Sequence, residues 1–123
     1  MSKKYTNVDV MAAARERMEI IFSRFEKVYV AFSGGKDSGV MLHLALEAAE
    51  KQGKLPLHVL FIDLEAQYAQ TVDFLAFMLR DPRIVPHWVC LPLNLRNAVS
   101  QISPHWKCWD AAKKDLWVRP LPR

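Results

Sequence analysis

The sequence predicts an α/β fold in which a parallel sheet carries helices on both of its faces. Three apolar, strand-like runs cover residues 27–32, 57–63 and 87–93, and segments with helical periodicity lie between them. The strand-like runs are apolar on both sides, which is typical of parallel strands buried between helices. The first run also leads straight into a glycine-containing turn, at the carboxyl ends of the strands, where ligands of parallel sheets bind.

The chain should open with an amphipathic helix from Asp9 to Phe25, where apolar residues recur every three or four positions. Either Thr6 or Asn7 would cap this helix, because a side-chain oxygen can accept from the first helical N–H groups. A short β-branched and aromatic strand from Lys27 to Phe32 follows.

The next helix is expected from about Asp37 to Gln52, and Gly53 is placed to end it with a left-handed residue. Its core-facing residues are expected to be Val40, Met41, Leu44 and Ala48.

A second buried strand is predicted from Leu57 to Asp63, and a helix from Gln67 to Leu79 that Asp81-Pro82 would stop. The third strand is predicted from His87 to Leu93. Asn94 can then cap a short helix that runs to Ile102.

The turn after the first strand has the sequence Ser33-Gly34-Gly35-Lys36-Asp37-Ser38. Glycines between a strand and a helix let the backbone approach a ligand, and the positive end of the helix dipole favours an anion such as phosphate. A Walker A loop is disfavoured, because Val30 stands where its first glycine belongs. The dinucleotide fingerprint also fails, since Lys36 takes the place of its second glycine.

The spelling S-G-G-x-D-S resembles the signature loop of the PP-loop superfamily, which contains N-type ATP pyrophosphatases and sulfonucleotide reductases. The resemblance implies an adenine nucleotide alpha hydrolase-like fold that binds ATP or phosphoadenosine phosphosulfate (PAPS) and acts at the α-phosphate or the sulfate. The alternative is an ordinary turn in which Ser33 or Asp37 caps the helix.

In the nucleotide-binding interpretation, backbone N–H groups of Gly34, Gly35 and Lys36 cradle the phosphates, and Ser33 and Ser38 donate hydroxyl hydrogen bonds. The Lys36 ammonium is the catalytic candidate, because it would neutralise charge on departing pyrophosphate.

Two carboxylates join this candidate site. Asp37 would hold Mg²⁺ beside the phosphates, or else cap the helix. Asp63, at the carboxyl end of the second strand, would take a ribose hydroxyl or help to hold the metal, or else cap the next helix.

The segment Leu60-Phe61-Ile62-Asp63, with Gln70-Thr71 after it, resembles the PAPS reductase-like branch of the superfamily. Trp106 to Asp110 and Trp117 to Pro120 further resemble its IbrA-type proteins, which are larger bacterial regulators. The Glu-Cys-Gly type motif of true reductases has no match here, and Cys108 lies in a different context. We therefore leave open whether the chain catalyses a reaction or is a regulator or remnant that binds without turnover.

The domain interpretation is one PP-loop domain over residues 1–123, with 103–123 as an extension rich in tryptophan and proline. Further strands of the family domain are missing, so we expect a truncated domain whose sheet is incomplete on its C-terminal side. An unpaired edge favours a homodimer or a longer partner chain that completes the sheet.

At 123 residues, with 51% hydrophobic and 24% charged residues, the chain has the length and composition of one globular domain. No apolar run suits a membrane span or a secretory signal, so we expect a cytoplasmic protein without membrane contact. A net charge of +4 suits phosphate-bearing ligands. Nucleic acid is an open partner class, because basic residues and tryptophans gather near the C-terminus: Lys113, Lys114, Arg119, Arg123, Trp106, Trp109 and Trp117.

The remaining histidines and cysteines give weaker signals. His58 and His87 are expected to be structural, since the sequence shows no partner for either. Cys90 is expected in the middle of a strand as a small core residue, and Cys108 is expected to be exposed.

Overall fold

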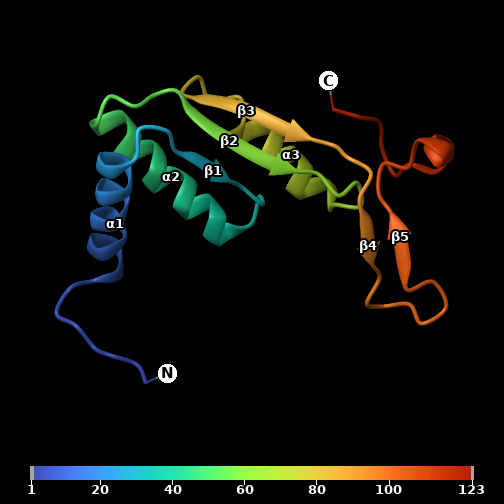
Figure 1. The fold of residues 1–123 in the computed structure, drawn as a ribbon, viewed down its shortest axis with the longest axis horizontal. Coiled ribbons are helices and arrows are strands. Elements are labelled where there is room, and N and C mark those ends of the chain that lie inside the picture. The colour runs from blue at the N-terminus through green and yellow to red at the C-terminus, as the bar shows by residue number, and fades with distance from the viewer. Residues whose placement is uncertain (1, 123) are drawn as a thin grey trace.

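The computed structural model describes residues 2–122 of the chain. Its first part alternates helices and strands, and its last part is a two-stranded ribbon followed by a short 3₁₀ helix (Figure 1). The elements are α1 (Val10–Arg24), β1 (Tyr29–Ala31), α2 (Lys36–Lys51), β2 (Leu57–Ile62), α3 (Ala69–Met78), β3 (Ile84–Val89), β4 (Asn94–Arg96), β5 (His105–Lys107) and η1 (Ala111–Leu116).

The main sheet is parallel, with strand order β1-β2-β3. In its register Val30 lies opposite Val59, and Val59 lies opposite Pro86. The predicted α/β class and parallel sheet are confirmed, and the carboxyl ends of all three strands meet at one edge.

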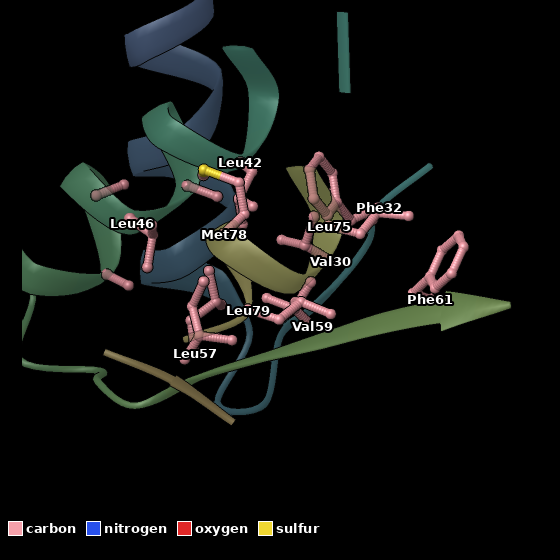
Figure 2. Packing of buried hydrophobic residues seen from close by; sticks show 14 of the residues in the cluster. Val30, Phe32, Leu42, Leu46, Leu57, Val59, Phe61, Leu75, Met78 and Leu79 are labelled. Atoms are coloured by element: carbon pink, nitrogen blue, oxygen red, sulfur yellow. The ribbon is translucent and has the colours of Figure 1, made fainter. Parts of the chain in front are cut away.

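The helices of residues 2–122 cover one face of this sheet. Figure 2 shows side chains of β1, β2, α2 and α3 meeting in one core. Along β2, Leu57, Val59 and Phe61 are buried, whereas His58 and Ile62 on the opposite face are exposed. The second helical layer expected from the sequence is therefore not supplied by the described residues.

The helix ends follow from local sequence. Asp9 is the N-cap of α1, and its side chain accepts from the N–H of Ala12 at 2.8 Å. The expectation of Thr6 or Asn7 was wrong, because Asp9 stands directly before the first helical turn. At the end of α2, Gly53 has φ +66° and Lys54 N–H donates to Ala49 O, which confirms the left-handed cap.

Two of the four residues of α2 that were predicted to face the core are buried. Leu44 and Ala48 are buried, but Val40 and Met41 are exposed. The buried stripe of α2 combines Leu44 and Ala48 with four residues that were not predicted: Leu42, Ala45, Leu46 and Ala49. The stripe is wide because α2 is enclosed between the sheet and α1.

Two expectations after residue 80 were wrong. β3 begins at Ile84 and not at His87, and Pro86 lies within it at the edge of the sheet, where a missing N–H breaks no ladder bond. Residues 94–102 form no helix. Asn97 Oδ1 accepts from Val99 N–H, and Asn97 N–H donates to Pro104 O, so a turn and an antiparallel ribbon form instead.

Candidate functional site

The glycine turn between β1 and α2 lies at the carboxyl edge of the sheet. Phe32 N–H still pairs with Leu60 O, after which Gly34 takes φ +81° and redirects the chain into α2. A Cβ on Gly34 would lie 3.0 Å from Leu75 Cγ and from Thr71 Cγ2 of α3. Gly34 is therefore required both by its left-handed backbone and by the closeness of α3.

The N-terminus of α2 opens towards this turn without a side-chain cap. Gly35 is the N-cap residue, and no side chain among the described residues accepts from the first turn of α2. The first N–H groups of any α-helix have no intrahelical acceptor, and they carry the positive end of the dipole. The turn thus presents unsatisfied donors to an anion.

The side chains of the turn border these donors. Ser33 Oγ and Ser38 Oγ are 2.8 Å apart, and Gly35 N–H donates to Ser33 Oγ at 3.3 Å. Lys36 and Asp37 are exposed in the first turn of α2. Asp37 lies inside the helix, after the N-cap position that Gly35 occupies.

Asp63 lies at the same edge, directly after β2, and is fully buried. Its Oδ1 accepts from Arg119 Nη2 at 2.5 Å, and its Oδ2 accepts from Trp88 Nε1 at 2.7 Å. Glu65 N–H donates to Oδ1 at 2.9 Å. Burial of Asp63 opposes ionisation, but these hydrogen bonds and the Arg119 charge outweigh it and hold the pKa of Asp63 below its ordinary value.

The C-terminal segment is attached to the sheet through the same cluster. Trp109 Nε1 donates to Asp63 O at 2.7 Å, and Trp109 N–H donates to Glu65 Oε2 at 3.1 Å. The Arg119 guanidinium lies 5.1 Å from the centre of the Trp109 ring. Sequence reasoning missed these two hydrogen bonds of Trp109, because each joins residues that are more than forty positions apart.

Several residues near the C-terminus are thus engaged within the chain. Trp109 is buried, Arg119 is paired with Asp63, and Trp117 Nε1 donates to Asp110 O. Arg123 lies outside the described residues. Of the residues that suggested nucleic acid, Trp109, Trp117 and Arg119 therefore make hydrogen bonds within the chain.

The cysteines differ from expectation. Cys108 is fully buried, and its thiol donates to Leu91 O, so the expectation of exposure was wrong. Cys90 follows the end of β3 and donates to Asp63 Oδ2 at 3.7 Å. Burial, with the Asp63 charge, raises the pKa of Cys90 to about 11. Such a thiol is protonated at neutral pH and is a poor nucleophile.

Sequence reasoning also missed a histidine pair on the uncovered face of the sheet. His58 Nδ1 and His87 Nε2 are 2.8 Å apart, and the rings stack with centres 5.1 Å apart. The parallel register places Leu60 opposite His87, so the strands bring the rings together diagonally.

No group of three or more histidine, cysteine, aspartate or glutamate side chains within residues 2–122 could hold a metal ion by itself. A site with a single protein carboxylate still suits Mg²⁺, because proteins commonly bind this ion through one or two carboxylates together with nucleotide phosphates. Asp37 is the carboxylate next to the open helix N-terminus. No helix in the described part of the chain is long and apolar enough to cross a bilayer.

Comparison with known families identifies the family of the chain. The model of the phosphoadenosine phosphosulfate reductase domain matches residues 27–89, which run from β1 through the loop to β3. The chain belongs to the phosphoadenosine phosphosulfate reductase domain family. The resemblance to the PAPS reductase-like branch is thereby confirmed.

Curated relatives agree with this family. The uncharacterized protein YbdN of Escherichia coli K12 is 42% identical over 119 residues, which cover 94% of this chain and 29% of YbdN. Sulfate adenylyltransferase subunit 2 of Mycobacterium bovis BCG is 42% identical over 52 residues, or 42% of this chain and 16% of that protein. The same subunit of Magnetococcus marinus is 36% identical over 84 residues, or 68% of this chain and 25% of that protein.

The chain therefore spans less than a third of the length of these relatives. No solved structure matches it.

Proposed function

We propose that this member of the family binds an adenine nucleotide, ATP or PAPS, at the loop from Ser33 to Ser38. The observation that carries the proposal is the uncapped N-terminus of α2, reached through Gly34 with φ +81°. An anion placed there accepts hydrogen bonds from otherwise unsatisfied N–H groups. The names of the sulfate adenylyltransferase relatives support nucleotide and sulfate chemistry.

In this proposal, backbone N–H groups at Gly34, Gly35 and Lys36 bind the phosphates, and the hydroxyls of Ser33 and Ser38 lie beside them. The Lys36 side chain, exposed at the start of α2, neutralises phosphate charge. Mg²⁺ bound with the nucleotide would supply further neutralisation, and Asp37 would be its protein ligand. In a complete enzyme the reaction would take place at the α-phosphate or the sulfate.

Asp63 belongs to the proposed site through the backbone that it positions. Its two carboxylate oxygens are bonded to Arg119 and Trp88, so it fixes the end of β2 beside the loop. Direct contact with a ribose hydroxyl or with the metal would require exchange of one of these partners.

A binding protein without turnover is the second candidate, and the cysteines favour it over a reductase. Cys108 is buried, and the Cys90 thiol has a pKa of about 11. The Cys90 thiol therefore supplies little of the thiolate that reduction of an activated sulfate requires, and Cys108 is closed off from solvent. We also propose that the chain falls in the IbrA-type branch, on the likeness of residues 106–110 and 117–120.

Equilibrium dialysis against labelled ATP and PAPS, each with Mg²⁺, tests binding at this loop. Lys36→Ala is expected to weaken binding at least tenfold, whereas Lys4→Ala, which removes another exposed charge outside the site, should leave it unchanged. Equal affinity of the two variants would refute the proposed site. If the wild type binds ATP at this loop, an assay for release of pyrophosphate would distinguish an enzyme from a binding protein.

A further inference from the structure

Two histidines from neighbouring strands of the main sheet meet through their ring nitrogens. His58 Nδ1 of β2 and His87 Nε2 of β3 are 2.8 Å apart, the planes of the two rings differ by 18°, and both residues are exposed. The distance between these nitrogens is much shorter than the 5.1 Å between the ring centres. The two imidazoles therefore present these nitrogens to each other.

The strands hold this pair in place. The register of β2 and β3 sets Leu60 opposite His87, so His58 lies two residues before the position directly opposite. Leu57 and Val59, on either side of His58, are buried in the core and fix the backbone that carries its ring. Side chains on packed strands keep their spacing better than side chains on loops.

Both facing nitrogens can become ligands of a metal ion. A hydrogen bond between two neutral imidazoles uses one hydrogen, so one of the two nitrogens already offers a lone pair. The other nitrogen offers one when its ring adopts the second tautomer, with the hydrogen on the nitrogen farther from the pair. Because both residues are exposed, water can accept that hydrogen bond.

The spacing of the nitrogens indicates which ions fit. Two neighbouring ligands at about 2.0 Å from a square-planar ion are about 2.8 Å apart, whereas on tetrahedral Zn²⁺ they are about 3.3 Å apart. The observed 2.8 Å matches the square-planar arrangement of Cu²⁺ or Ni²⁺. Each exposed ring then needs only to turn about its side-chain bonds to aim its lone pair at the shared ion.

The surroundings favour an ion that prefers nitrogen ligands over one that prefers oxygen. The pair lines a hollow of about 690 Å³ together with Glu26, Lys27 and Lys54. Two ammonium groups outnumber one carboxylate there, so charge and ligand type both disfavour Mg²⁺ and Ca²⁺. Within residues 2–122 no third histidine, cysteine, aspartate or glutamate completes a metal-binding group with the pair, which leaves the other coordination positions to water.

We propose that His58 and His87 form a two-histidine site for Cu²⁺ or Ni²⁺, with water in the remaining coordination positions. This site is separate from the proposed nucleotide loop. His58 is the second residue of β2, whereas the loop lies at the carboxyl edge of the sheet. The two sites can therefore be tested independently.

Titration of the untagged full chain with Cu²⁺, followed by calorimetry and electron paramagnetic resonance, tests the proposal. The chain has four histidines, so His58→Gln and His87→Gln can be matched by His43→Gln on α2 and His105→Gln on β5, which are also exposed. Ni²⁺ serves as a second probe in calorimetry, because thiols do not reduce it. Circular dichroism checks that every variant is folded.

The wild type is expected to bind Cu²⁺ with a spectrum of two coordinated nitrogens. His58→Gln and His87→Gln should each weaken binding roughly tenfold or more and leave one coordinated nitrogen, while both controls bind as the wild type does. Three results would overturn the proposal: equal affinity of all four variants, a loss of affinity in only one member of the pair, or tighter binding of Zn²⁺ than of Cu²⁺ by the wild type.

Discussion

Gly34 determines the shape of the proposed nucleotide loop, because it combines a left-handed backbone with close contact to α3. Alanine at this position would keep φ near +81° only with strain, and its Cβ would lie 3.0 Å from Leu75 and Thr71. We expect Gly34→Ala to lower the free energy of unfolding by roughly 2 kcal/mol, measured by urea denaturation.

Two other glycines provide matched controls. Gly53 has φ +66°, but a Cβ added there would have no neighbour within 4 Å, so Gly53→Ala measures backbone strain alone. Gly39 lies inside α2 with equally open space, and Gly39→Ala should stabilise the helix by about 0.5–1 kcal/mol. If Gly34→Ala cost no more than Gly53→Ala, contact with α3 would not constrain the loop.

The Arg119–Asp63 pair makes a second prediction at the residue scale. Asp63 is fully buried, and removal of its charged partner leaves an uncompensated buried carboxylate. Arg119→Met is expected to lower the free energy of unfolding by about 3 kcal/mol. Arg15→Met, which breaks an ion pair whose side chains are about half exposed, should cost well under 1 kcal/mol. A similar small loss for both variants would contradict the structural role of Arg119.

The position of Asp63 at the edge of the sheet could be predicted from the sequence, but its partners could not. The end of an apolar strand marks where the carboxylate lies, whereas Arg119 reaches it from 56 positions away. His58 and His87 meet for the same reason, since their contact depends on strand pairing and not on local sequence. Long-range contacts leave no periodic signal.

At the scale of elements, Trp109 attaches the C-terminal segment to the sheet. Its indole N–H donates to Asp63 O, and its ring lies beside Arg119. Trp109→Phe is expected to increase the rate of limited proteolysis within residues 111–122 several-fold, because the segment loses this hydrogen bond and opens locally more often.

Trp106→Phe serves as the control for this experiment. Trp106 is half-buried in β5 and makes no side-chain hydrogen bond within the described residues. Equal cleavage rates in the two variants would show that Trp109 does not anchor the segment.

Strong periodicity made α1, α2 and α3 predictable, with boundaries within about two residues of those observed. The segment after β3 was not predictable in the same way. Asn94 suits a helix cap, yet the ribbon forms because Leu95 and Trp106 pair across it and the backbone of Asn97 bonds to Pro104. Pairing between the two strands of the ribbon therefore outweighs the preference of Asn94 to cap a helix.

At the scale of the whole molecule, the carboxylate pKa values predict acid sensitivity. The folded-state pKa of Asp63 is lowered by its hydrogen bonds to Arg119 and Trp88 despite burial, and Arg83 lowers that of Asp81 to about 2. The folded state therefore binds fewer protons than the unfolded state. The resulting stabilisation is complete above about pH 4 and is lost as the pH falls towards 2.

Urea midpoints measured from pH 6 to pH 2 check this expectation. The wild type should lose stability steeply below about pH 4, and Arg119→Met should lose less over the same interval because less stabilisation remains. A wild-type midpoint that stays constant down to pH 2 would contradict the assignment.

The α/β class and the parallel sheet were also predictable from the sequence, since both depend on the order of elements. Coverage of the second face was not predictable in the same way, because the sequence indicates strands that are apolar on both sides, whereas the core formed with the described helices lies on one face. The sequence shows that Tyr29 and Ile62 are large apolar residues. Only the structure shows that both are exposed, on a face of the sheet that no described helix covers.

The thermal unfolding midpoint, with and without Mg·ATP or Mg·PAPS, tests the central claim of nucleotide binding most directly. At a ligand concentration about a hundred times its dissociation constant, the folded state should gain roughly 2.7 kcal/mol, which raises the midpoint by about 10 °C for a chain of this length. The wild type should show this shift with one of the two nucleotides, and Lys36→Ala, whose binding is at least tenfold weaker, should show about half of it or less at the same ligand concentration. A cooperative wild-type transition that neither nucleotide moves would contradict the claim.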